Sequence, residues 1–300
     1  MPITMKIYIL LAFLGLFIFN SCQFNQSVNK DLTTGAYSRG DGITCDNVVL
    51  QINGKTENRN EFIDGETVKI IFENVNGLTR IENKTYPEMS MFIVKNEQDT
   101  IKAQKDILYD AKDGVDIYPL QLSSSFIAAL PYQNGEKYKV IVQIKDKKGK
   151  GKFTYSLPFQ VKPNEVLKIE NNGLKYKYIY LWDEDTQLAV VDNHLYNRHK
   201  YDLVIERLNG FKVSEGKVFP ILSLRITDKN QQKILDNPNL LKEIEQIGIK
   251  PDEFEKNPFG VNFILAEKKI NNPYKLTLRL KDILSGKELN IKMDFTLEEE

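Results

Sequence analysis

The sequence predicts an all-β protein built from two tandem β-sandwiches. Three observations support this fold class. Short alternations of apolar and polar residues recur along the chain, a long hairpin pattern occurs twice, and Asn-Gly turn signals separate several of the alternating runs. A chain of 300 residues is also long enough for two domains that each bury a core of their own.

The duplicated pattern is that of a β-hairpin. In the first copy, apolar residues alternate with polar ones from Tyr138 to Ile144, and the alternation returns from Phe153 to Val161. The same pattern recurs 136 positions later, from Tyr274 to Leu280 and from Leu289 to Leu297. Because strict alternation is typical of a strand with one buried face, the sequence predicts this hairpin once in each of two related units.

The first 22 residues predict an export signal. Lys6 precedes a 13-residue apolar run, Ile7 to Phe19, which is too short to span a bilayer comfortably but suits a signal peptide. The following Ser21-Cys22 resembles the end of a lipobox, the signal by which bacterial lipoproteins have their cysteine lipidated. Phe19 and Asn20 depart from the usual lipobox residues and resemble the relaxed Bacteroidetes form. Residues 23–44 are polar and lack periodicity, so we expect a flexible tether there.

The two units are predicted at residues 45–163 and 164–300. Their earlier strands match at a constant spacing of 133 positions, which relates Asn76-Gly77 to Asn209-Gly210 and Pro87 to Pro220. Each unit holds about seven short strands, which is the size and rhythm of an immunoglobulin-like or fibronectin-like β-sandwich. Neither unit contains the paired cysteines of antibody domains, so each core must hold without a disulfide.

The second unit is expected to contain a short helix. Asn237-Pro238 suits a helix start and Gly248 suits its end, which predicts about ten helical residues. A further helical turn can follow Pro251. The apolar residues on one face of this helix would be Leu240, Leu241, Ile244 and Ile247. The matching region of the first unit, Asp106 to Leu130, is less regular and is expected to form a long loop with a helical turn.

Charge and motifs argue against nucleic-acid binding and favour a protein that is not an enzyme. The chain carries 41 basic and 41 acidic residues, so its bulk charge attracts neither nucleic acid nor an anionic surface. The sequence contains no phosphate-binding glycine loop, nucleophile elbow or zinc-protease motif. We therefore expect no enzymatic activity, no cofactor and no metal site. The alternative is a hydrolase with its site in the diverged segments, Asp106 to Leu130 or Ile234 to Phe263.

Three smaller features also receive structural interpretations. His194 and His199 are the only histidines, and residues five apart on a strand point to opposite faces, so two solvated surface histidines are expected. The acidic run Asp183-Glu184-Asp185 lacks the spaced ligands of a calcium loop and predicts a charged turn. Cys45 is expected to be a small, half-buried residue rather than a reactive thiol, and lipidation of Cys22 would leave it without a disulfide partner within the chain.

Lysines gather at the turn of the first duplicated hairpin. A solvated turn that favours solubility is the main interpretation, and contact with phosphate groups of lipid or glycan is the alternative. The matching turn of the second unit, Asp282 to Glu288, is not basic. The lysines concerned are Lys145, Lys147, Lys148, Lys150 and Lys152.

An aromatic stripe is the main candidate for a ligand or interdomain surface. It consists of Tyr176, Tyr178, Tyr180 and Trp182, at every second position of one predicted strand. The interleaved Leu181 matches a core-facing position of the first unit, so the rings are expected to face outward, where such a stripe needs an explanation. Stacking against the first unit or the linker is favoured. A platform for sugar rings, protein loops or another ligand is the alternative, and a reversed register would place the rings in the core.

The whole chain resembles lipoproteins of Bacteroidetes or Flavobacteria type that carry two tandem immunoglobulin-like domains. The resemblance rests on Cys22, on the segment DLTTGAYSRGDGITCDNV that begins at Asp31, and on the paired Asn-Gly and proline positions. It implies a protein of the cell envelope, held by its lipid at the outer membrane. The periplasmic face is favoured, because no acidic run follows Cys22 as it often does in surface-exported lipoproteins of this group. We expect a binding or scaffolding protein with a protein or glycan partner. The alternative is a glycan-binding accessory subunit of a polysaccharide-uptake system.

Overall fold

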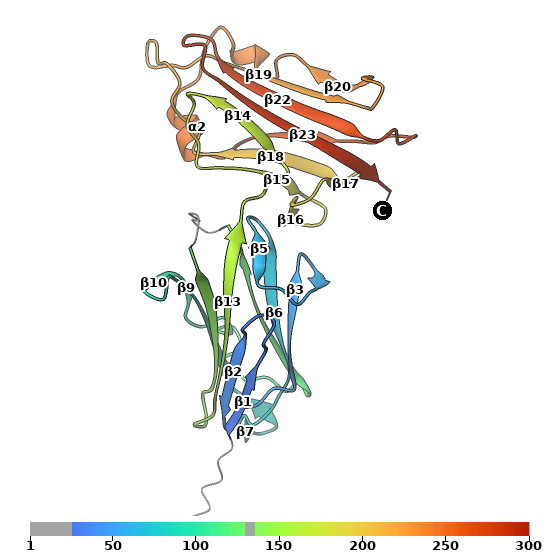
Figure 1. Cartoon of the computed structure of the whole chain (residues 1–300). Helices are drawn as coiled ribbons and strands as arrows, with labels where there is room; N and C mark the ends of the chain where they lie inside the picture. Colours follow the sequence, from blue (N-terminus) through green and yellow to red (C-terminus); the bar gives the residue numbers. More distant parts are fainter. Residues whose placement is uncertain (1–25, 130–135, 300) are drawn as a thin grey trace, which may run out of the picture. The chain divides into compact units, whose positions relative to one another are not determined.

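The computed structural model describes residues 26–129 and 136–299, which form strands almost throughout (Figure 1). The helical segments in these ranges are a 3-10 turn, η1 (Lys242–Ile244), and a five-residue helix, α2 (Asp252–Lys256). The predicted all-β class is confirmed. In the described part of the chain, no helix combines the length and apolarity needed to cross a membrane. The predicted signal peptide and Cys22 lie outside the described residues.

The first sandwich consists of two mainly antiparallel sheets and a small ribbon formed by β7 (Arg80–Ile81) and β8 (Lys84–Thr85). One sheet has the order β1-β2-β13-β12-β9-β10, with β5 in parallel on β13, and the other has the order β11-β6-β3-β4. The strands of the first sheet are β1 (Gln26–Lys30), β2 (Tyr37–Asp41), β5 (Glu61–Ile63), β9 (Pro87–Lys95), β10 (Asp99–Gln104), β12 (Tyr138–Asp146) and β13 (Lys152–Lys162). Those of the second sheet are β3 (Asn47–Ile52), β4 (Lys55–Thr56), β6 (Thr67–Val75) and β11 (Leu120–Ile127).

The second sandwich has the same plan. One sheet has the order β14-β23-β22-β19-β20, with β17 in parallel on β23, and the other has the order β16-β15-β18-β21. The strands of the first sheet are β14 (Lys168–Asn172), β17 (His194–Tyr196), β19 (Pro220–Thr227), β20 (Lys233–Asn237), β22 (Tyr274–Asp282) and β23 (Glu288–Glu298). Those of the second sheet are β15 (Tyr178–Asp183), β16 (Leu188–Ala189), β18 (Lys200–Glu206) and β21 (Phe259–Ile264).

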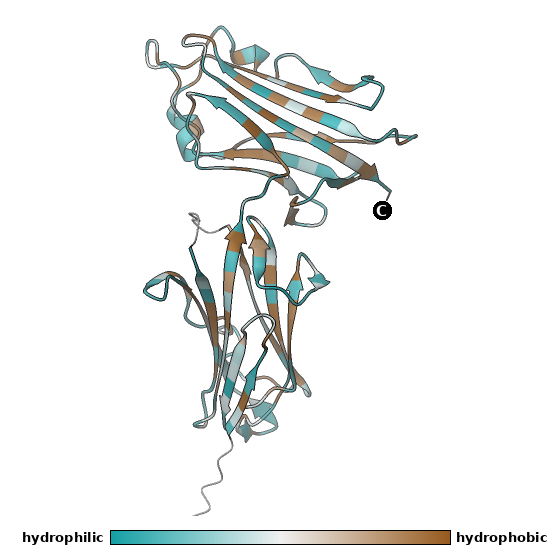
Figure 2. Cartoon of the chain, in the orientation of Figure 1, coloured by the Kyte–Doolittle hydropathy of each residue, from teal (hydrophilic) through white to brown (hydrophobic). Residues whose placement is uncertain are grey.

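The alternating pattern places the core of each sandwich where the sequence predicts it. Every second residue of β12 from Tyr138 to Ile144 is at most 2% exposed, and the same holds in β22 from Tyr274 to Leu280. Figure 2 shows hydrophobic and hydrophilic residues alternating along β22 and β23. Burial of one such aliphatic side chain contributes about 1.5–3 kcal/mol, so apolar burial can stabilise each sandwich without a disulfide. Cys45, the cysteine among the described residues, is free.

The duplication extends to strand pairings that no hydropathy pattern reveals. β5 pairs in parallel with the end of β13, and β17 pairs in the same way with the end of β23. Side-chain contacts at matching positions have the acidic partner on opposite strands. Glu61 contacts Lys162 at 2.6 Å in the first sandwich, and His194 contacts Glu298 at 2.6 Å in the second. The backbone arrangement is therefore repeated while the side chains on it have been exchanged.

A buried aspartate links the two sheets of each sandwich. Asp146, at the end of β12, accepts a hydrogen bond at 2.7 Å from the backbone N–H of Thr79, in the loop that follows β6. Asp282, at the end of β22, accepts one at 2.8 Å from the N–H of Lys212, in the loop that follows β18. Burial alone would raise the pKa of Asp146, but the hydrogen bonds from Thr79 and from the hairpin turn lower it below the ordinary value. Both aspartates therefore act as internal anchors.

The diverged segments, Asp106 to Leu130 in the first unit and Ile234 to Phe263 in the second, look unrelated in sequence. In each, a backbone carbonyl accepts a hydrogen bond from a lysine side chain. Lys84 donates a hydrogen bond to the carbonyl of Asp113 at 3.1 Å, and Lys217 donates one to the carbonyl of Ile247 at 2.7 Å. Lys84 and Lys217 are 133 positions apart, which is the repeat spacing. The diverged segments are thus equivalent segments with different side chains.

The predicted ten-residue helix of the second unit is wrong. The segment forms only η1, and two of its supposed core residues, Leu240 and Ile247, are 39% and 61% exposed. Without a buried apolar face, so short a segment gains too little to stabilise an α-helix. The helical turn expected after Pro251 does form, as α2, and it buries Phe254.

The predicted tether at residues 23–44 is wrong for residues 26–30 and 37–41. These residues form β1 and β2, and β2 pairs with β13 from Tyr37 opposite Ser156 to Asp41 opposite Lys152. Asp31 shapes the turn between them by accepting a hydrogen bond from the N–H of Thr33 at 2.8 Å. Backbone hydrogen bonds join these strands to the edge of the sheet, so their side chains need not be apolar.

We predict that Asp282→Ala lowers the free energy of unfolding of the second sandwich by about 2–4 kcal/mol, because it leaves buried backbone donors unpaired. Urea unfolding followed by the fluorescence of Trp182, which lies in this sandwich, measures the change. Asp294→Ala is the control, because Asp294 is exposed and forms a surface ion pair with Lys168. We expect Asp294→Ala to lower the free energy of unfolding by about 0.5 kcal/mol or less. Equal costs for the two variants would contradict an anchoring role for Asp282.

Candidate functional site

Three aromatic rings lie together on one face of β15. β15 pairs with β18 so that Tyr178 is opposite Glu206, Tyr180 is opposite Val204 and Trp182 is opposite Asp202. Residues directly opposite each other in a sheet point to the same face. Of the interleaved residues, Leu181 and Leu203 are 1% exposed and belong to the core, and the half-buried Ile179 packs against it. We call the outer set the aromatic face: Tyr178, Tyr180, Trp182, Asp202, Val204 and Glu206.

Tyr176 does not belong to this face. It precedes β15 and packs against the core of the second sandwich, as does Ile179. Arg207, at the end of β18, has a φ of 51°, a left-handed conformation that interrupts the regular pleat. The following residue, Leu208, is fully buried. The four-residue stripe of the sequence is thus a three-ring face preceded by a half-buried tyrosine that packs against the core.

The neighbours of the rings leave them little covered by their own sheet. On one side, Ala189 of β16 is opposite Trp182. On the other, Gly260 and Asn262 of β21 continue the face beyond Val204 and Asp202. Large side chains are therefore absent from the positions flanking the rings in these strands. Such a surface can accept a flat or extended ligand.

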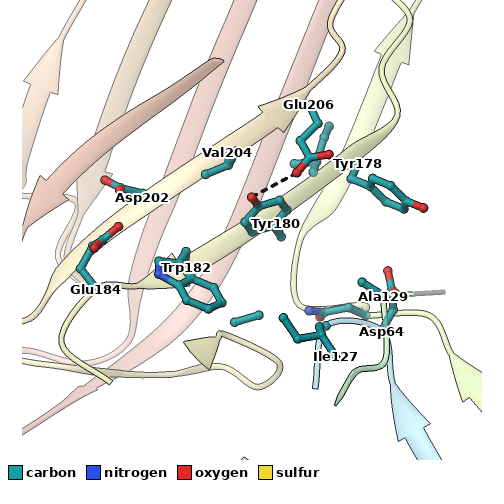
Figure 3. A pocket seen from close by; sticks show the side chains of 14 residues that line it. Asp64, Ile127, Ala129, Tyr178, Tyr180, Trp182, Glu184, Asp202, Val204 and Glu206 are labelled. Carbon is teal, nitrogen blue, oxygen red and sulfur yellow. Dashed lines mark hydrogen bonds between the residues drawn. The ribbon is translucent and has the colours of Figure 1, made fainter. Parts of the chain in front are cut away.

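Carboxylates surround the rings. The hydroxyl of Tyr180 donates a hydrogen bond to Glu206 at 3.3 Å (Figure 3). Burial raises the pKa of Tyr180, and the negative charge of Glu206 raises it further. The phenol therefore stays protonated at neutral pH and serves as a donor.

Glu184 and Asp202 form a carboxyl pair beside Trp182 (Figure 3). The backbone N–H of Glu184 bonds to the carbonyl of Lys200 at 2.9 Å, which continues the pairing of β15 with β18. A side-chain hydrogen bond with Asp202 raises the pKa of Glu184. Oδ1 of Asp202 is buried and has no hydrogen-bond partner among the described residues. The pair thus offers acceptor oxygens next to an indole ring.

The two histidines differ in their surroundings. His194 is exposed, as the sequence predicts, but His199 is buried, so the prediction of a surface position is wrong for it. Nδ1 of His199 lies 2.8 Å from Oδ2 of Asp183. Asp183 is also buried at 5% exposure and closes the turn after β15 by accepting a hydrogen bond from the N–H of Asp185 at 2.9 Å. The acidic run does form a turn, and a buried histidine stabilises it.

Asp183, Asp185 and His199 bring one ligand atom each within 4.8 Å of one another, as a metal site would require. Their hydrogen bonds account for this arrangement, because Asp185 accepts one from the N–H of Lys200 at 2.7 Å. The first sandwich has an equivalent bond at 2.9 Å between the side chain of Asn53 and the N–H of Thr67. Because the same link occurs there without a histidine, we assign the cluster to holding the turn.

The diverged segments proposed for a hydrolase show no pair of carboxylates suited to acid–base catalysis in their described part. The acids with shifted pKa values there are Asp236 and Asp252. Hydrogen bonds from Lys233 and Lys256, respectively, lower these values. A general acid instead needs a raised pKa.

The thiol of Cys45 is half-buried, and burial together with the charge of Asp46 raises its pKa to about 11. It is therefore protonated at neutral pH and a poor nucleophile.

Comparisons with known proteins do not assign the site. No family model and no curated protein matches the chain. Among solved structures, the chain is similar to pT26-6p, with 10% identity over 92% of this chain and 66% of that one and a TM-score of 0.25. It is also similar to three N-terminal domains of the outer capsid protein Hoc of bacteriophage RB49, with 10% identity, coverages of 89% and 79%, and a TM-score of 0.20. Latent PorU from Porphyromonas gingivalis shows 11% identity, coverages of 84% and 34%, and a TM-score of 0.21. These scores are too low to support an inference about function.

We predict that neutral acrylamide quenches Trp182 efficiently and that caesium ions quench it more strongly than iodide, because Glu184 and Asp202 attract cations and repel anions. Trp182 is the only tryptophan, so steady-state fluorescence reports on this face alone. Glu184→Gln should reduce the difference between the quenching constants of caesium and iodide. A Trp182 shielded from acrylamide would instead mean that the aromatic face is covered within the protein.

Proposed function

We propose that this protein is a lipid-anchored, non-enzymatic binding protein of the bacterial cell envelope and that the aromatic face contacts its partner. The observation that carries the proposal is the grouping of Tyr178, Tyr180 and Trp182 on the side of β15 that points away from its core. Aromatic residues in such positions are enriched in protein interfaces, where they supply most of the binding energy.

The duplication supports a role in binding rather than in folding. The first unit has Asn47, Val49 and Gln51 at the positions that match the rings. Since that unit forms the same strand, β3, without aromatic residues, the β-sandwich does not require them. At these positions, only the second copy carries aromatic rings.

The charges around the rings favour a partner with exposed basic side chains. Glu184, Asp202 and Glu206 all lie beside the aromatic rings (Figure 3). An arginine can stack on an aromatic ring while its guanidinium pairs with a carboxylate. A protein segment rich in arginine or lysine therefore fits this face better than an acidic one.

A glycan-binding accessory subunit of a polysaccharide-uptake system is the second candidate. Trp182 offers an apolar surface for a sugar ring, and Glu184 and Glu206 beside the rings offer carboxyl oxygens for hydroxyl groups (Figure 3). Such a ligand would be neutral or cationic, because the carboxylates repel acidic sugars.

The anchor is inferred from the sequence. Cys22 follows the apolar run and precedes β1 by four residues. We propose that its lipid holds the protein at the outer membrane, facing the periplasm, with the first sandwich close to the bilayer because β1 begins where a tether was expected.

We expect that the wild-type protein partitions into the detergent phase of a Triton X-114 extraction and that Cys22→Ser moves it to the aqueous phase. Loss of the lipidated thiol removes the apolar chains that drive partition. Cys45→Ser is the matched control and should leave partition unchanged, because Cys45 lies within the first sandwich. A Cys22→Ser protein that stays in the detergent phase would rule out this anchor.

We predict that Trp182→Ala weakens binding to an immobilised arginine-rich peptide by about 30-fold, the effect of losing a central aromatic contact. Surface plasmon resonance at low and high salt measures it, and binding to the peptide should fall as salt rises. Tyr37→Ala, an exposed tyrosine of the first sandwich, is the control. A different result would favour the glycan candidate: the protein is retained on a neutral polysaccharide at low and high salt, and Trp182→Ala abolishes this retention. Binding to neither ligand would count against the aromatic face as a binding site.

A further inference from the structure

The turn that joins β12 and β13 carries a dense group of exposed lysines, which we call the lysine hairpin: Lys145, Lys147, Lys148, Lys150 and Lys152. Two of them are engaged by acids, Lys147 by Asp106 at 3.0 Å and Lys145 by Glu88 at 3.9 Å. The other three have no salt bridge with any described residue, and the ammonium of Lys148 lies 5.0 Å from the centroid of the Tyr86 ring. Asp146, the acid within the hairpin, is buried and accepts hydrogen bonds from the backbone N–H groups of Thr79 and Lys148.

The lysine hairpin lies at the same end of the first sandwich as the start of β1. Gln26, the first residue of β1, is opposite Asp41 of β2, and Asp41 is opposite Lys152 of β13. The three strands run side by side in Figure 1. Since neighbouring strands lie about 4.8 Å apart, the Cα atoms of Gln26 and Lys152 are separated by roughly 10 Å.

The sequence places the expected anchor close to this end. Cys22 precedes Gln26 by four residues, and four residues span at most about 14 Å even when fully extended. A lipid on Cys22 would therefore bring a bilayer surface to within a few residues' length of the lysine hairpin. Lysines this near an anionic membrane are attracted to it, whereas charges several Debye lengths away are screened.

The fold does not explain the lysines. The equivalent hairpin between β22 and β23 has the same buried aspartate, Asp282, and the same backbone bond across its turn, at 2.9 Å against 3.0 Å in the first copy. Yet that turn has Ile283, Leu284 and Ser285 where the first copy has lysines and a glycine. A basic turn is thus needed neither for the hairpin nor for its link to the opposite sheet.

We propose that the lysine hairpin is a membrane-contact surface that binds the anionic headgroups of the bilayer in which the protein is anchored. Lipid and lysines would then act at one end of the sandwich and set its orientation on the membrane. The proposal rests on the anchor proposed above, but the affinity of the hairpin for anionic lipid can be measured without a lipid on the protein.

The test uses residues 23–300, which contain every described strand but no lipidated cysteine. We expect co-sedimentation with vesicles of equal parts phosphatidylglycerol and phosphatidylcholine at low salt, and none with pure phosphatidylcholine. The triple variant Lys148→Gln, Lys150→Gln, Lys152→Gln should lower the partition coefficient by roughly 100-fold, since each lysine near an anionic surface contributes about fivefold. High salt should abolish binding by the wild-type protein.

The matched control is Lys268→Gln with Lys269→Gln, which removes exposed lysines from the second sandwich and should change the partition by less than twofold. Melting temperatures check that all variants remain folded. Equal binding to the two kinds of vesicle, no binding to either, or unchanged binding by the triple variant would overturn the proposal. None of these results bears on Cys22, because extraction of the full chain tests the anchor separately.

Discussion

One buried aspartate in each sandwich holds the end of the duplicated hairpin against a loop that belongs to the opposite sheet. Asp146 and Asp282 accept backbone hydrogen bonds from Thr79 and Lys212, and so connect the two sheets. Neither sandwich has a disulfide to do this, so the link depends on a charged group that is fully paired by its donors. With the sheets fixed in this way, the outer faces and turns are free to differ between the copies.

The sequence was sufficient to predict the strands that depend on side-chain burial, and insufficient for those that depend on the backbone. β12, β13, β22 and β23 follow from strict alternation, because each must hide one apolar face. β1 and β2 are polar strands at the edge of the sheet: β2 is hydrogen-bonded to β13 and β1 to β2, and hydropathy does not record such bonds. The ten-residue helix failed for the opposite reason, since its apolar spacing was present but Ile247 had nothing to pack against.

For the candidate site too, the sequence predicted what side-chain alternation determines and missed what strand register and backbone conformation determine. Alternation correctly separated Tyr180 and Trp182 from Leu181, but it could not show that Tyr176 packs against the core instead of joining the other rings. The proximity of Glu184 to Asp202 depends on the register of two strands, which the sequence does not specify. The burial of His199 depends likewise on Asp183, a partner 16 residues away.

The two surfaces that distinguish the copies carry opposite charge, and this separates their possible roles. A bilayer negative enough to attract the lysine hairpin repels a face bearing Glu184, Asp202 and Glu206. Under these two proposals, the acidic aromatic face would not take the membrane as its ligand, and a partner with basic groups would approach it from the aqueous side. Duplication of one hairpin-based sandwich thus accounts for both features. In this proposal the first copy carries a basic turn next to the anchor, and the second carries a different turn and three rings for recognition.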